Sequence, residues 1–128
     1  INDDTVLTTS AWTEAFIQTL ASHNPTNIGI VGPTHNYGNK RILTYEFVHR
    51  KHIDIFGFYY PRTYRGWYAD GWMTRLYLPD RVSKLDNVHV KHVESLGQRY
   101  NKHAMSLTAR MVDVESGKIV LERYVLKN

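Results

Sequence analysis

Apolar residues near the start of the chain recur with the spacing of an amphipathic helix. They stand at positions i, i+3, i+4 and i+8, namely Trp12, Ala15, Phe16 and Leu20. Such a spacing places the four side chains on one helical face. Thr9-Ser10 precede them as candidate N-cap residues, and Asn24-Pro25 follow as a stop signal. The pattern predicts a helix between these two signals.

Two segments have the patterns of β-strands. The run Ile28-Gly29-Ile30-Val31 is apolar, rich in β-branched residues and closed by Gly32-Pro33, which is typical of a buried strand. Val88, Val90 and His92 alternate with polar residues. This alternation predicts a second strand with one buried face.

A second helix is predicted from Thr44 to Phe56, with Gly57 just after its end. Its apolar face consists of Phe47, Val48, Ile55 and Phe56. The stretch from Phe58 to Trp72 is dense in aromatic residues, arginine and glycine, and Pro61 interrupts any regular pattern. We interpret it as a long structured loop, and loops of this kind are usually functional.

The last third contains two further helical patterns. Trp72 to Tyr77 predicts a short helix stopped by Pro79. Ala104 to Val114 fits a helix with Gly117 after its end, whereas Val112 to Val120 fits equally a hairpin that turns at Ser116 and Gly117. We favour the helix. Helices alternating with strands predict an α/β fold, a mixed sheet with packed helices.

Composition supports one folded domain over residues 1–128. The chain is 42% hydrophobic and contains no cysteine, which excludes disulfides, thiolate metal sites and thiol catalysis. No apolar stretch reaches the roughly 18 to 20 residues of a membrane span, and no signal peptide is visible, so we expect a soluble segment of unknown compartment. The net charge of +4 suits anionic ligands such as sugar nucleotides or nucleic acid.

Two neighbouring carboxylates, Asp3 and Asp4, follow a segment that has the character of a strand end. Magnesium and manganese prefer oxygen ligands, and magnesium is usually held by one or two carboxylates together with substrate phosphates. The pair therefore predicts a divalent-cation site that also holds a diphosphate. The alternative is a solvated turn or an acidic pair at a helix start.

A second carboxylate, Asp70, stands beside Gly71 and among the rings of Trp67, Tyr68 and Trp72. An aspartate packed against aromatic rings loses solvation and gains basicity, which suits a general base for a hydroxyl group. The alternative places Asp70 at the N-cap of the next helix, with the aromatic residues in the core.

The seven histidines do not show the spacing of a zinc site. His92 or His103 is instead a candidate to complete a site begun by Asp4. Arg62, Arg65 and Arg75 interleave with aromatic rings that could stack on nucleic-acid bases, but no nucleic-acid motif accompanies them. We therefore rank a basic nucleic-acid-binding domain third among the possible functions.

The order of these segments resembles the second half of a GT-A glycosyltransferase, an enzyme that uses a nucleotide-activated sugar. The matching segments are Asn2-Asp3-Asp4, NIGIVGP, ILTYEFVHRKHIDIFGFYYP, WYADGWMTRLY, VHVKH and QRY. The resemblance covers nearly the whole chain. It implies the C-terminal part of a GT-A domain, whose N-terminal nucleotide-binding strands would lie before Ile1 in a longer chain.

The resemblance also implies roles for individual residues. Asp4 would bind Mn²⁺ or Mg²⁺, Asp3 would lie near the donor ribose or a metal-bound water, and His92 would add a metal ligand. Asp70 would accept the proton of the hydroxyl acceptor. The aromatic wall of the acceptor site would comprise Tyr59, Tyr60, Trp67 and Trp72.

Two positions depart from the family pattern. Related sequences tend to carry a second acidic residue where Gly71 stands, and the acidic triplet begins with Asn2 instead of an aspartate. These departures support an alternative, a non-catalytic GT-A-like structural or interaction module. The partners of the enzyme would be a nucleotide-sugar donor and a hydroxyl acceptor.

Overall fold

A computed structural model describes residues 5–35, 39–64, 67–93 and 105–128. Within these ranges the chain forms a three-stranded mixed sheet and four helices, which confirms the predicted α/β class. The elements are β1 (Thr5–Leu7), α1 (Trp12–Ser22), β2 (Ile30–Thr34), α2 (Lys51–Phe56), α3 (Ala69–Tyr77), β3 (Val82–His92) and α4 (Leu107–Val125).

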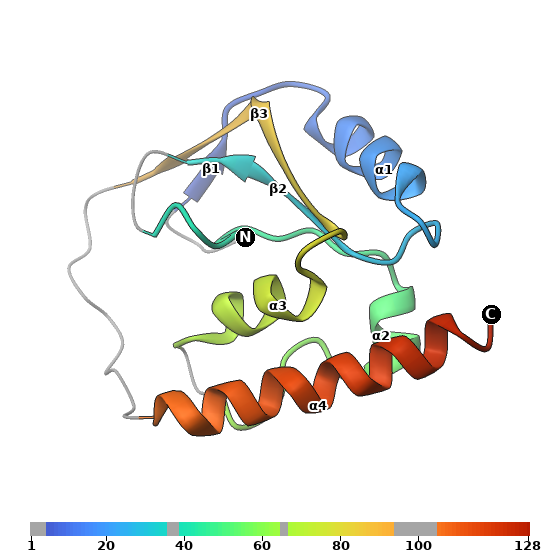
Figure 1. Ribbon diagram of the computed structural model, residues 1–128. Helices are drawn as coiled ribbons and strands as arrows, with labels where there is room; N and C mark the ends of the chain where they lie inside the picture. The colour runs from blue at the N-terminus through green and yellow to red at the C-terminus, as the bar shows by residue number, and fades with distance from the viewer. Residues whose placement is uncertain (1–4, 36–38, 65–66, 94–104) are drawn as a thin grey trace.

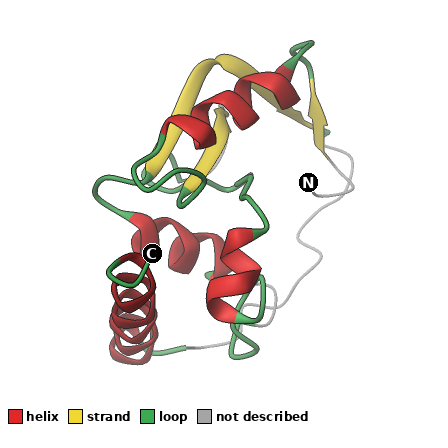
Figure 2. Ribbon diagram, turned by 90° about the vertical axis from the view of Figure 1, so that its right-hand side faces the viewer, coloured by secondary structure: helices red, strands yellow, loops and turns green. Residues whose placement is uncertain are grey.

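Strand β3 is the centre of the sheet, antiparallel to β1 and parallel to β2. Helix α1 covers one side, and the other three helices lie on the opposite side (Figure 1, Figure 2). Helix α3 lies between the sheet and α4, and contacts both. Two strands and a short helix before Pro79 are present as predicted. However, β2 begins at Ile30 instead of Ile28, and β3 and α3 both begin earlier than expected.

The predicted apolar face of α1 is confirmed, but its predicted N-cap is wrong. Phe16 and Leu20 are buried against the sheet. The N-cap position is Ala11, whose φ of 56° is left-handed. The hydroxyl of Thr9 instead accepts a hydrogen bond from the backbone N–H of His89 at 3.0 Å. Thr9 therefore ties the start of α1 to β3 rather than capping the helix.

The helix predicted from Thr44 to Phe56 is wrong over its first half. Phe47 pairs with Val31 of β2 through two backbone hydrogen bonds of 3.0 and 2.7 Å. Phe47 packs with the α1 cluster, whereas Val48 packs with the α3 and α4 cluster. Neighbouring side chains that point to opposite sides are typical of extended backbone. The helix was predicted because apolar residues on both sides of this extended segment happen to match the spacing of a helical face.

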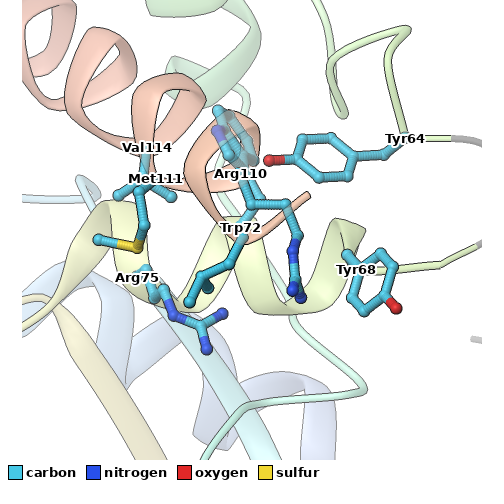
Figure 3. A pocket seen from close by; sticks show the side chains of 8 residues that line it. Tyr64, Tyr68, Trp72, Arg75, Arg110, Met111 and Val114 are labelled. Atoms are coloured by element: carbon cyan, nitrogen blue, oxygen red, sulfur yellow. The ribbon is translucent and has the colours of Figure 1, made fainter. Parts of the chain in front are cut away.

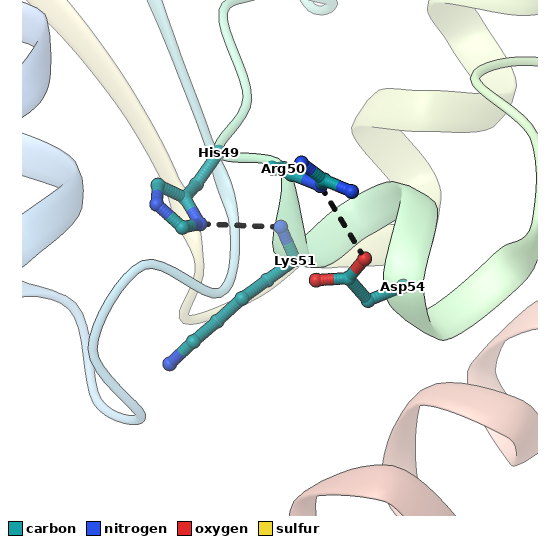
Figure 4. A network of polar contacts seen from close by, with 4 residues as sticks. All are labelled: His49, Arg50, Lys51 and Asp54. Carbon is teal, nitrogen blue, oxygen red and sulfur yellow. Dashed lines mark hydrogen bonds and ion pairs between the residues drawn. The ribbon is translucent and has the colours of Figure 1, made fainter.

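Helix α2 begins only at Lys51, whose backbone N–H donates to Nδ1 of His49 at 3.1 Å (Figure 4). On its exposed surface Arg50 and Asp54 form an ion pair of 3.8 Å. The helix ends at Gly57, whose φ of 75° is left-handed, as predicted for the residue after a helix. His49 thus has a local structural contact at the start of α2.

Strand β2 continues through the predicted closure at Gly32-Pro33 to Thr34. Proline is tolerated because the pairing of β2 with β3 is irregular between Pro33 and Thr34. A Cβ atom on Gly32 would lie 2.8 Å from the carbonyl oxygen of Tyr45. Glycine at this position therefore allows residues 43–48 to run closely along β2.

Helix α4 is continuous through Gly117, so the hairpin alternative is wrong and the glycine does not end the helix. A Cβ atom on Gly117 would lie 2.9 Å from Cδ1 of Leu76 and 3.4 Å from the ring of Trp72. The glycine is therefore the place where α3 packs closely on α4.

His52 is a core residue with two hydrogen bonds. Its Nε2 lies 2.9 Å from the carbonyl oxygen of Tyr59, and its Nδ1 lies 2.7 Å from the hydroxyl of Tyr77. A carbonyl only accepts, so Nε2 carries the proton and Nδ1 accepts from the tyrosine. Burial lowers the pKa of His52 below its ordinary value. Burial in the folded protein therefore favours the neutral form of this imidazole.

We expect the free energy of unfolding to fall as the pH decreases below about 6.5, where the imidazole of the unfolded chain takes up a proton. The pKa of His52 is lower in the folded state, so its contribution is complete above this pH and decreases towards the folded pKa. Urea denaturation between pH 5 and 8 tests this. In His52→Gln the decrease should be smaller, and an equal pH dependence in both proteins would contradict the prediction.

Candidate functional site

The ends of the three strands lie together along one border of the sheet. We call this border, marked by Thr5, Thr34 and His92, the candidate edge. Because β2 and β3 are parallel, their carboxyl ends, at Thr34 and His92, point to the same edge. Strand β1 is antiparallel to β3, so its first residue, Thr5, lies opposite His92. In open α/β sheets, ligands gather beyond the carboxyl ends of strands. Asp4 is the residue that precedes Thr5 in the sequence.

Of the predicted metal ligands, only His92 lies within the described residues. Asp3, Asp4 and His103 lie outside them. In the part of the chain that the structure describes, no group of three or more histidine, aspartate or glutamate side chains could hold a metal ion. Among the candidate metal ligands, His92 is therefore the one that the structure describes. The carboxylate ligands remain predictions from the sequence.

Asp70 lies in the first turn of α3, and the alternative that placed it at the N-cap is wrong because Tyr68 occupies that position. Its Oδ1 accepts a hydrogen bond from the backbone N–H of Gly71 at 2.7 Å. Burial raises the pKa of Asp70, while this hydrogen bond and the positive charge of Arg75 partly oppose the increase. Thr74, one turn further along α3, donates to the carbonyl oxygen of Asp70 at 2.9 Å and accepts the backbone N–H of Leu43 at 3.0 Å. These contacts link the first turn of α3 to the segment that runs beside β2.

Glu46 is a carboxyl group that the sequence reasoning missed. It lies on the extended segment beside β2, and its Oε1 accepts a hydrogen bond from the hydroxyl of Tyr60. Burial raises the pKa of Glu46 to about 7, and the nearby charge of Asp70 adds to this increase. The available signal was a single carboxylate within the largely apolar stretch from Ile42 to Val48. Buried carboxyl groups that influence each other's pKa are frequent in functional sites.

The four aromatic residues of the predicted acceptor wall differ in their exposure. Tyr59 and Tyr60 are 37% and 36% exposed, and their rings are perpendicular with centroids 4.6 Å apart. Trp67 is partly buried. Trp72 is 3% exposed and contacts the rings of the core. Of these four residues, Tyr59 and Tyr60 are the most exposed, and the ring of Trp72 is a core group.

The arginines of the predicted nucleic-acid surface differ in their surroundings. Arg65 lies outside the described residues, and Arg62 is exposed. Arg75 donates to the carbonyl oxygen of Gly71 at 3.0 Å. One of the three side chains is thus used in a contact within α3, which gives the nucleic-acid interpretation no added support.

Two hollows lie against helix α4. The first, between α3 and α4, includes Tyr68 and Arg110, whose guanidinium stacks 4.1 Å above the Tyr68 ring (Figure 3). Its volume of about 10 Å³ has room for roughly one water molecule. The second is an apolar groove of about 240 Å³ between α2 and α4, lined in part by Phe58 and Val120. Neither hollow is lined by Asp70 or Glu46.

Comparisons with known proteins do not identify a relative. No protein-family profile, no curated protein sequence and no solved structure matches this chain. Among the described residues, no helix is both long enough and apolar enough to cross a membrane.

Proposed function

We propose that this chain belongs to a metal-dependent glycosyltransferase, which transfers a sugar from a nucleotide-activated donor to a hydroxyl acceptor. Its domain would correspond to the C-terminal part of a GT-A fold. The observation that carries the proposal is the common edge of the sheet, where Thr5, next to Asp4 in the sequence, lies opposite His92.

In this reaction the oxygen of the acceptor hydroxyl attacks the anomeric carbon of the donor sugar. The bond between that carbon and the diphosphate oxygen breaks, and the carboxylate of Asp70 takes the hydroxyl proton. The raised pKa of Asp70 supports this role, because a carboxylate with a higher pKa is a stronger base. The backbone N–H of Gly71 holds one oxygen of Asp70 at 2.7 Å, which limits the orientations of the carboxylate.

The residues that would hold a divalent cation are His92 and Asp4. His92 would supply an imidazole from the strand position opposite Thr5, and Asp4, one residue before Thr5 in the sequence, would supply a carboxylate. A complete protein cage is unnecessary, because diphosphate oxygens and water usually complete the coordination of Mg²⁺. When bound, Mn²⁺ or Mg²⁺ would neutralise the negative charge on the departing diphosphate.

The first test is the replacement of Asp4 with alanine in the full-length protein. We expect the unmodified protein to bind Mn²⁺ weakly alone and at least about tenfold more tightly with uridine or guanosine diphosphate, because phosphate oxygens complete the coordination. Asp4→Ala should remove this gain. Isothermal titration calorimetry with Mn²⁺, with and without each nucleotide, measures both quantities.

Asp54→Ala is the matched control, because this carboxylate is exposed on α2 and pairs only weakly with Arg50. It should leave Mn²⁺ and nucleotide binding unchanged. If Asp4→Ala binds Mn²⁺ and both nucleotides as the unmodified protein does, the metal assignment is wrong. The non-catalytic module would then be the better description of the chain.

A further inference from the structure

Glu46 accepts hydrogen bonds from the hydroxyl groups of both exposed tyrosines, Tyr59 and Tyr60. The hydroxyl of Tyr60 donates to the side-chain Oε1 of Glu46, and the hydroxyl of Tyr59 donates to the main-chain oxygen of the same residue at 3.2 Å. The neighbouring residue, Phe47, is fixed to β2 by two backbone hydrogen bonds. The two phenols are therefore tied to the sheet through Glu46.

A second contact fixes the backbone of the two tyrosines. The carbonyl oxygen of Tyr59 accepts the Nε2–H of the buried His52 at 2.9 Å. The backbone of the pair is thus held by His52, and both hydroxyl groups are held by Glu46. More than a third of each tyrosine remains exposed.

We propose that Glu46 is a positioning residue of the acceptor site, which fixes Tyr59 and Tyr60 so that the exposed surface of this perpendicular pair contacts an uncharged sugar ring. This inference rests on the proposed glycosyl transfer and gives its acceptor a chemical class. Tyrosine faces suit sugars because the C–H groups of a sugar ring pack well on an apolar aromatic surface that keeps a polar edge.

The surroundings favour an uncharged acceptor over an anionic one. Burial raises the pKa of Glu46 and of the Tyr60 hydroxyl, and the charge of Asp70 adds to both increases. A carboxylate on the acceptor would add a further negative charge to this environment, which costs free energy in a partly desolvated site.

The carboxyl group and the phenol depend on each other. Oε2 of Glu46 is buried and has no hydrogen-bond partner among the residues that the structure describes. Among the described residues, the hydroxyl of Tyr60 is therefore the side-chain group that donates a hydrogen bond to the carboxyl group of Glu46. Loss of either partner should release the ring of Tyr60, because the remaining constraint acts on Tyr59.

The test compares Glu46→Ala, Glu46→Gln and Tyr60→Phe. The glutamine carbonyl can still accept the Tyr60 hydroxyl, whereas the alanine variant loses the acceptor and the phenylalanine variant loses the donor. Saturation-transfer NMR would measure the binding of cellobiose and maltose, two neutral disaccharides, with glucuronate as an anionic comparison. The spectra of ¹³C-labelled tyrosines report the environment of both rings in the same samples.

We expect Glu46→Ala and Tyr60→Phe each to weaken disaccharide binding at least about fivefold, and Glu46→Gln to stay within about twofold of the unmodified protein. The Tyr60 resonance should shift in Glu46→Ala and remain near its original position in Glu46→Gln. Glucuronate should bind more weakly than the disaccharides. Circular dichroism confirms that each variant is folded, and the glutamine and phenylalanine variants still test the proposal if the alanine variant is not.

Unchanged disaccharide binding in folded Glu46→Ala and Tyr60→Phe would overturn the inference, as would the absence of disaccharide binding to the unmodified protein. The Mn²⁺ and nucleotide titration separates this failure from a failure of the proposed function. If nucleotide binding depends on Asp4 but disaccharide binding does not depend on Glu46, only the positioning role of Glu46 is wrong. If the Glu46 pattern holds and no nucleotide binds, the transfer reaction is wrong.

Discussion

Replacement of Asp70 with asparagine should lower the rate of sugar transfer by a factor of about 10² to 10⁴, the usual contribution of a general base. Asparagine has nearly the same shape as aspartate, and its side-chain oxygen can still accept the backbone N–H of Gly71 that now lies 2.7 Å from Oδ1. The start of α3 should therefore be preserved. The amide cannot take the proton of the acceptor hydroxyl, so the chemical step is lost while nucleotide binding remains.

The pH dependence of kcat/KM supplies an independent signature of Asp70. A general base acts only when deprotonated, so the rate should rise with pH through the pKa of Asp70, which burial raises above its ordinary value. Asp70→Asn should lose this part of the profile. Asp54→Asn, on the exposed surface of α2, should keep both the rate and the profile. Equal transfer rates in Asp70→Asn and the unmodified protein would remove the catalytic role of Asp70.

Replacement of Trp72 with alanine should lower the free energy of unfolding by about 3 to 5 kcal/mol, as large-to-small changes in a packed core do. The side chain is 3% exposed, and its ring lies about 6 Å from the rings of Phe56 and Phe58. The Trp72 indole N–H also donates to the carbonyl oxygen of Asp113 at 3.3 Å, which links α3 to α4. Alanine would leave a cavity where these elements meet.

Urea denaturation measures the loss, and Leu126→Ala is the matched control because this side chain is 86% exposed. The control should change the free energy of unfolding by no more than about 0.5 kcal/mol. The result also separates the two roles considered for Trp72. A stable Trp72→Ala protein with weakened disaccharide binding would support the acceptor-wall role predicted from the sequence instead of the core role.

The sequence alone determined the elements whose signals are local. The apolar spacing from Trp12 to Leu20 identified α1, because a helix places residues three and four apart on one face. Gly57 marked the end of α2 because glycine adopts a left-handed conformation easily, and its φ of 75° agrees. The alternation from Val88 to His92 identified part of β3. Together these signals predicted a mixed sheet with packed helices.

Only the tertiary structure decided the contacts that join distant segments. Phe47 is extended because its backbone pairs with Val31, and Thr9 binds the backbone of His89 instead of capping α1. Glu46 and Asp70 are 24 positions apart in the sequence, yet the charge of one raises the pKa of the other. Local spacing cannot encode these relationships, because backbone pairing and burial depend on partners that only the folded chain brings together.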